Sequence, residues 1–277
     1  MAERKLVFLT TQLPFPPNSG GTIKSYRLIE FFAQHFDLVL CTLLKNDDVE
    51  HLEQFRNQFS GIKIISHKQQ TDRSALNYLK SFFANKTLNE YRNWNSSFFT
   101  KVTAEFNSDA LAFVDHFEMY QYLPKDFIGK VVLHEHNAEW MLWERFALVE
   151  TNPIKRIVLN LEANRIKKKE VRAAQNSTLT FAAPDDRTAL INAGVAENKI
   201  NETYHLGNDE LLNLLLNIGF LVVSARSSLP HAEYDEFCKR VDVKIASQIV
   251  SMPPPTLVLL KYLFLNQQQI VSKVDTV

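Results

Sequence analysis

The chain has 277 residues, and its 31 Lys and Arg residues balance its 31 Asp and Glu residues. A net charge of zero argues against a general nucleic-acid-binding protein, whose surface is normally basic. Apolar residues make up 45% and charged residues 22%, as in soluble globular proteins. The two cysteines have no metal-ligand spacing, and no segment has the length of a signal peptide or a membrane span. We therefore expect a cytoplasmic protein.

Short apolar runs alternate with amphipathic segments over the first two hundred residues. Strands are predicted over residues 5–10, 37–44, 61–66, 110–115, 131–133 and 177–182. Helices are predicted over residues 22–35, 49–59, 76–83, 98–106, 137–148, 154–174 and 185–192. This alternation predicts an α/β fold: a Rossmann-like parallel sheet with helices on both faces. Ligands of such sheets bind beyond the carboxyl ends of the strands, so functional residues are expected there.

The alternation stops after about residue 207. Residues 208–277 contain a Leu-rich stretch, a run of three prolines and no regular sequence of strands and helices. We therefore expect one domain over residues 1–207, followed by an atypical, mainly helical tail over residues 208–277.

A loop with two adjacent glycines joins the first predicted strand to the first helix. It contains Ser19, Gly20, Gly21 and Thr22, in a chain with only seven glycines. Glycine lets the backbone approach a ligand closely, and the start of a helix favours a phosphate. The loop is neither a GxGxxG motif nor a P-loop. The alternative is a simple turn in which Ser19 or Thr22 caps the helix.

Two histidines and two carboxylates follow the predicted strand 131–133. On a strand, His134 and His136 would share one face and could bind a metal, but no third ligand is apparent, so no metal is predicted. A histidine here suits a hydrogen bond to a sugar hydroxyl, or the stabilisation of a transition-state charge. The alternative is that these residues cap a helix that begins at Asn137.

Polar residues also end the predicted strand 110–115, namely Asp115, His116 and Glu118. Two neighbouring strand ends with polar residues are what a polar ligand site requires. Separately, residues 151–175 carry seven Lys and Arg residues against two Glu residues. Such a basic helix either contacts an anionic membrane or ligand, or is an ordinary solvated surface.

Together these segments resemble the N-terminal domain of family 4 retaining glycosyltransferases, which have the GT-B fold. The likeness is carried by residues 14–24 (PFPPNSGGTIK), 115–123 (DHFEMYQYL), 131–145 (VVLHEHNAEWMLWER) and 169–190. It covers about residues 5–207. In the last of these segments, Ala183 stands where the family has a serine, whereas Asp186 fits the pattern.

The resemblance implies transfer of a sugar from a nucleotide-sugar to a glycan or lipid-linked acceptor, without a metal or other cofactor. It implies that residues 19–22 approach the donor diphosphate and that His136 is the catalytic residue beside the reacting sugar. It places Asp115, His116, Glu118, Asn137 and Glu139 on the acceptor and sugar side. The inner face of the membrane is a second expected location, reached through the basic helix 151–175.

No match to the family's donor-domain motif follows residue 208. We therefore expect that the donor domain is absent, because the chain is truncated or frame-shifted or because a partner chain supplies it. The alternative function is a non-catalytic sugar- or nucleotide-binding half-domain that needs a partner chain. A nicotinamide-dependent oxidoreductase is disfavoured because GxGxxG is missing, and a Ser-His-Asp hydrolase because GxSxG is missing.

Overall fold

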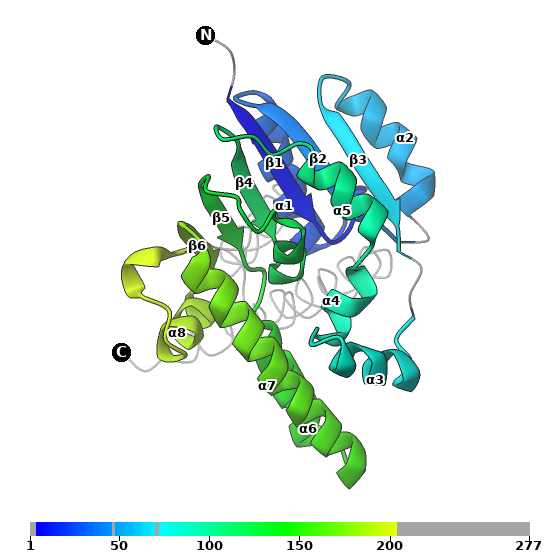
Figure 1. Ribbon diagram of the computed structural model, residues 1–277, viewed down its shortest axis with the longest axis vertical. Coiled ribbons are helices and arrows are strands. Elements are labelled where there is room, and N and C mark those ends of the chain that lie inside the picture. The colour runs from blue at the N-terminus through cyan, green and yellow to red at the C-terminus, as the bar shows by residue number, and fades with distance from the viewer. Residues whose placement is uncertain (1–3, 46–47, 70–71, 204–277) are drawn as a thin grey trace, which may run out of the picture. The chain divides into compact units, whose positions relative to one another are not determined.

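The computed structural model describes residues 4–45, 48–69 and 72–203, and apart from residues 18–23 these residues form one unit. Seven parallel strands build a single sheet in the order β3-β2-β1-β4-β5-β6-β7 (Figure 1). The strands are β1 (Lys5–Thr10), β2 (Asp37–Leu44), β3 (Lys63–Lys68), β4 (Leu111–Asp115), β5 (Val131–His134), β6 (Leu179–Ala182) and β7 (Ile200–Glu202). This sheet confirms the predicted Rossmann-like α/β fold.

Alternating side chains of the strands enter two cores, one on each face of the sheet. In β1, Leu6 and Phe8 join one core, and Val7 and Leu9 join the other. The first core is closed by α1 (Gly20–Ala33) and α2 (Asp48–Gln58), and the second by α5 (Ser96–Thr103) and α7 (Pro153–Asn176). Burial on both faces explains why these strands read as continuous apolar runs.

The predicted helices are all present, but several short elements were not predicted. The remaining predicted helices are present as α3 (Ala75–Phe83), α6 (Glu139–Val149) and α8 (Pro184–Asn192). The prediction missed α4 (Leu88–Asn93), η2 (Glu197–Lys199) and β7, which are all shorter than seven residues. Such short elements carry too few residues for a periodic pattern. The short helix η1 (Phe117–Tyr122) lies where the resemblance of residues 115–123 implied one. The expected tail over residues 208–277 lies outside the described residues.

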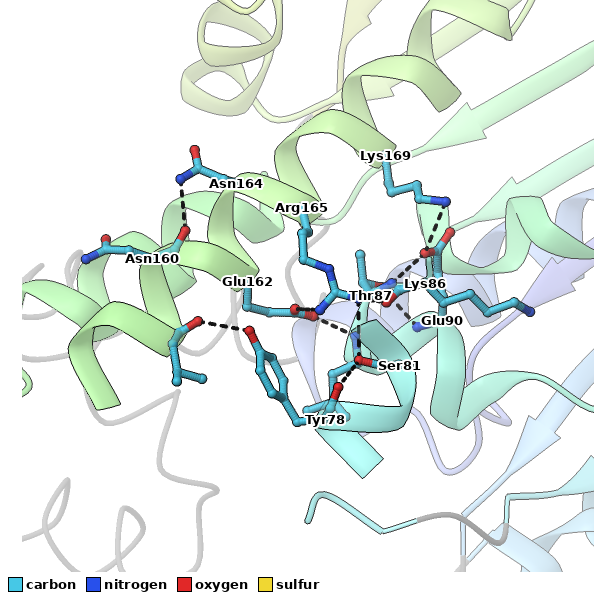
Figure 2. Close-up of polar contacts among 12 residues, drawn as sticks. Tyr78, Ser81, Lys86, Thr87, Glu90, Asn160, Glu162, Asn164, Arg165 and Lys169 are labelled. Atoms are coloured by element: carbon cyan, nitrogen blue, oxygen red, sulfur yellow. Dashed lines mark hydrogen bonds and ion pairs between the residues drawn. The ribbon is translucent and has the colours of Figure 1, made fainter. Parts of the chain in front are cut away.

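A buried ion pair on α7 holds α3 and α4 in place (Figure 2). The Glu162 carboxylate is fully buried; it accepts a hydrogen bond from Arg165 at 2.6 Å and one from the Leu88 backbone N–H, also at 2.6 Å. Arg165 also donates to the carbonyl of Lys86 and to Ser81 Oγ. Because Leu88 is the first residue of α4, this pair fixes where α4 begins.

The start of α4 is also capped locally. Thr87 Oγ1 accepts from the backbone N–H of Glu90, whose carboxylate accepts from the backbone N–H of Thr87, forming a capping box. Lys169 of α7 lies 3.8 Å from the same carboxylate (Figure 2). The position of α4 is therefore set by two independent groups of contacts.

We expect Arg165→Met to lower the free energy of unfolding by about 3–5 kcal/mol, because it leaves the Glu162 carboxylate buried without its cation. Chemical denaturation at pH 7 measures this loss. The matched control is Arg156→Met, on the exposed part of the same helix, which should stay within about 0.5 kcal/mol of the parent chain. Equal effects of the two substitutions would contradict the anchoring role of Arg165.

Candidate functional site

Three polar side chains lie in one row where the central strands end. Thr10 of β1 pairs in register with Asp115 of β4, and Asp115 pairs with His134 of β5. The sheet order reverses between β1 and β4, and this switch point is where open α/β sheets bind ligands. The strand register therefore gathers these residues at the ligand-binding edge.

Asp115 is the centre of this row. Its Oδ1 accepts hydrogen bonds from His134 Nδ1 at 2.7 Å and from His136 Nε2 at 2.8 Å. Its Oδ2 accepts from Ser25 Oγ at 2.7 Å and from Thr10 Oγ1 at 3.0 Å. An ionised carboxylate can only accept, so both imidazole nitrogens that face it carry a proton. The side chain that was predicted to be catalytic, His136, is thereby oriented by Asp115.

The ionisation of this cluster follows from these contacts. Burial alone would raise the pKa of Asp115, but the charge of His136 and the hydrogen bonds from both histidines hold it well below its usual value. Burial lowers the pKa of His134, against the opposing effect of Asp115. Asp115 is therefore a carboxylate at neutral pH, beside an uncharged His134.

His116 has an unusual backbone conformation next to this cluster. Its φ of 81° lies in a region that residues other than glycine rarely adopt, at a cost of about 1–3 kcal/mol. Its ring stacks on that of His136, with 4.2 Å between the ring centroids. Burial, and after it the charge of His136, lowers the pKa of His116 to about 3. The His116 ring is therefore neutral at pH 7.

Glu118 lies apart from the Asp115 cluster. Its Oε1 accepts a hydrogen bond from Asn89 Nδ2 of α4 at 3.2 Å, and both residues line a cavity of about 710 Å³. Burial, and after it the charge of Glu139, raises the pKa of Glu118 to about 8. Glu118 is therefore mainly a neutral carboxylic acid at pH 7.

The predicted phosphate loop has the geometry of a helix cap. The Thr22 hydroxyl accepts a hydrogen bond from the Ser19 backbone N–H at 2.9 Å, and Ser19 Oγ accepts from the Thr22 N–H at 3.4 Å. Gly20 begins α1, and a Cβ added to it would meet nothing within 4 Å. The capping alternative is thus present in the structure. A phosphate-binding role of Ser19, Gly20, Gly21 and Thr22 stays a prediction.

The other alternative, that residues after β5 cap a helix from Asn137, is wrong. Helix α6 begins at Glu139, and its N-cap, Ala138, makes no side-chain capping bond. Asn137 is exposed, and Glu139 is partly exposed and accepts from Trp143 Nε1 at 3.3 Å. The two histidines bond Asp115 instead, so Asn137 and Glu139 are not part of that hydrogen-bonded cluster.

The expectation that the histidines have no third companion is also wrong. Asp115, His134 and His136 offer three possible ligand atoms within 4.8 Å of one another. Two imidazoles and a carboxylate are a donor set used by zinc and non-haem iron. Sequence spacing missed this group because Asp115 comes from the neighbouring strand. That the activity requires no metal stays a prediction.

Two residues of α1 were not assigned a role from the sequence. Ser25 donates to Asp115, as described above, and Lys24 is buried with no hydrogen-bond partner for its Nζ among the described residues. Burial lowers the pKa of Lys24, while the charges of Asp115 and Asp186 oppose that shift. The edge of the sheet therefore contains a buried cation near its buried carboxylate.

Neither a protein-family model nor a curated protein matches the chain. Among solved structures, the chain is similar to Anabaena HepE in complex with UDP-glucose, with 11% identity and a TM-score of 0.41, over 88% of this chain and 66% of that one. It is also similar to the N-terminal domain of Candida albicans trehalose-6-phosphate phosphatase, with 11% identity and a TM-score of 0.43, over 80% of this chain and 54% of that one. The chain thus spans just under two thirds and just over half of these two structures.

We expect Asp115→Asn to lower the free energy of unfolding at pH 7 by about 2–4 kcal/mol, because the new amide faces donors that need an acceptor. The folded pKa of Asp115 is depressed, so its contribution is complete above a pH of about 4 and falls as the pH drops further. Denaturation curves at several pH values measure both effects. The exposed Asp109→Asn is the control and should change little.

A loss for Asp115→Asn no larger than that for Asp109→Asn would contradict the central role of the carboxylate.

Proposed function

We propose that the chain takes part in the retaining transfer of a sugar from a nucleotide-sugar to a glycan or lipid-linked acceptor, as a member of family 4 of the glycosyltransferases. The observation that carries this proposal is the Asp115–His136 pair at the switch point of the sheet. It places the histidine of the glycosyltransferase-like segment 131–145 at the edge where α/β sheets bind ligands.

The residues have separate roles in this proposal. Asp115 fixes the orientation of His136, which borders the reacting sugar. The N-terminal end of α1, with Gly20 and Gly21, stabilises the negative charge of the departing diphosphate through the helix dipole. Glu118 and the residues around it hold the acceptor. The donor-side contacts come from a second domain, which a partner chain would supply.

The alternative is a sugar- or nucleotide-binding half-domain without catalysis of its own. The burial of His136, which is 4% exposed, favours this alternative, because a catalytic group must reach the substrate. In that case the Asp115 cluster stabilises the strand ends, and ligands contact only the groups around it.

The deciding experiment is a calorimetric titration of the full chain with a panel of nucleotide-sugars and free nucleotides, followed by incubation with glycan acceptors. We expect saturable, diphosphate-dependent binding that Gly20→Val weakens on the order of tenfold, by blocking the close approach of a phosphate. Gly61→Val is the matched control, because a Cβ at either glycine meets nothing within 4 Å.

Formation of a product with the anomeric configuration of the donor supports sugar transfer. Binding without any product, also when candidate donor-domain chains are added, supports the half-domain. A folded chain that binds no nucleotide-sugar, no free nucleotide and no glycan acceptor contradicts both.

We also propose peripheral contact with an anionic membrane through the hairpin of α6 and α7. Where the two helices meet, Leu148, Val149 and Ile154 are 81%, 77% and 73% exposed, and Lys155 and Arg156 beside them are exposed too. Among the helices of the described residues, none is long and apolar enough to span a bilayer. Apolar side chains next to cations suit the surface of an anionic membrane.

We expect the chain to sediment with vesicles that contain phosphatidylglycerol and much less with phosphatidylcholine vesicles. Val149→Ser combined with Ile154→Ser should reduce sedimentation, because both apolar contacts are lost. The control is Ile128→Ser, which alters an isoleucine that is 90% exposed in another loop. Equal sedimentation of all variants would exclude the hairpin as the contact.

A further inference from the structure

The cavity that Glu118 lines lies beyond the ends of three neighbouring strands. Its wall contains Thr11 after β1, Lys45 after β2 and Lys68 at the end of β3. It therefore belongs to the ligand-binding edge of the sheet, on the β2 and β3 side of the Asp115 cluster. Its volume of about 710 Å³ is in the range of small-molecule sites.

The cavity concentrates positive charge in a chain that has no net charge. Lys45, Lys68, Arg73 and Arg92 line it, against the carboxyl groups of Asp72 and Glu118 only. Within the described part of the chain, no carboxylate forms an ion pair with Lys45, Lys68 or Arg73. A bound anion would relieve the repulsion among these cations.

The titration behaviour of the wall agrees with this charge. Burial lowers the pKa of Lys45, and the positive charges of Arg73 and Arg92 add to that shift while Asp48 opposes it. Burial also lowers the pKa of Arg92, and Arg73 again adds to the shift. Three of the four cations thus act on one another across the cavity.

The floor of the cavity is polar and buried. Asn89 and Asn93 of α4 and Glu118 of η1 are each 7% exposed. Asn89 donates to Glu118, but its own Oδ1 has no hydrogen-bond partner among the described residues. An unused buried acceptor is costly, and turning the Asn89 side chain toward the cavity would let a ligand hydroxyl group satisfy it.

Contacts with α7 fix the helix that carries the floor residues Asn89 and Asn93. Helix α4 supplies Asn89, Arg92 and Asn93, and its first turn is fixed by Glu162, Arg165 and the capping box (Figure 2). A preformed site loses less conformational entropy when its ligand binds.

We propose that this cavity binds a phosphorylated sugar, with the sugar hydroxyls on the floor at Asn89 and the phosphoryl group on the basic rim. The rim consists of the cationic side chains that line the cavity, namely Lys45, Lys68, Arg73 and Arg92. The rim alone would suit any phosphate, whereas the unpartnered buried acceptor selects a ligand that also has hydroxyl groups. Because Glu118 lines this cavity, the proposal rests on the acceptor side of the proposed function and names a phosphorylated sugar as the ligand there. Binding of that ligand can be measured whether or not the chain transfers sugar.

Calorimetry on the full chain at fixed ionic strength tests the proposal with four probes: glucose 6-phosphate, glucose, inorganic phosphate and UDP. We expect glucose 6-phosphate to bind at least about tenfold more tightly than glucose or phosphate, because only it engages both the rim and the floor. Lys68→Met and Arg73→Met should each weaken its binding on the order of tenfold, and both residues are exposed, so the fold should be kept. Lys80→Met, on the exposed surface of α3, is the matched control and should have no effect.

Asn89→Ala separates the two parts of the site. It should weaken the binding of glucose 6-phosphate and leave the binding of phosphate unchanged, and circular dichroism should show that the variant is folded. Equal affinities for phosphate and glucose 6-phosphate would show a bare anion site and overturn the proposal. If UDP binds more tightly than glucose 6-phosphate, and Lys68→Met and Arg73→Met abolish that binding, the proposal is overturned in favour of a nucleoside diphosphate. No binding of any probe to the folded chain also overturns it, whatever the result with nucleotide-sugars.

Discussion

The carboxylate of Asp115 imposes the central constraint on this domain. A buried charge is stable only when hydrogen-bond donors surround it, and here four donors come from β1, α1, β5 and the turn after β5. These donors reach one carboxylate only if β1, β4 and β5 end at the same level. The requirement to satisfy Asp115 therefore also defines the edge at which a ligand can bind.

A second buried carboxylate, that of Glu162, fixes the position of α4, which carries part of the cavity lining. Glu162 is satisfied by Arg165 and by the backbone of Leu88, so α4 cannot shift along α7 without leaving a charge unpaired. The floor residues Asn89 and Asn93 are carried on that helix. The strand ends thus depend on Asp115 and the cavity floor on Glu162, and a ligand need not touch either residue.

The sequence predicted where helices and strands lie along the chain better than it predicted which of them lie side by side. Residues 5–10 and 37–44 form strands with the predicted bounds, because strands buried on both faces are continuous apolar runs. Asp115 and His136 were both recognised at strand ends, but the contact between them depends on strand order, which the chain order does not give. Helix α4 had a signal, the spacing of Thr87 and Glu90, that could have been read as a capping box. Lys45, Arg73 and Arg92 lie in separate segments, and only the fold brings them together.

A short, strained segment of the chain joins the Asp115 cluster to the cavity that Glu118 lines. Asp115 ends β4, His116 takes a φ of 81°, and η1 then carries Glu118 into the cavity wall. The strain at His116 is maintained because its backbone N–H bonds the His134 carbonyl and its ring stacks on His136. Only His116 and Phe117 lie between Asp115 and Glu118, so the same short segment fixes both the stacking of His116 on His136 and the position of Glu118 in the cavity wall.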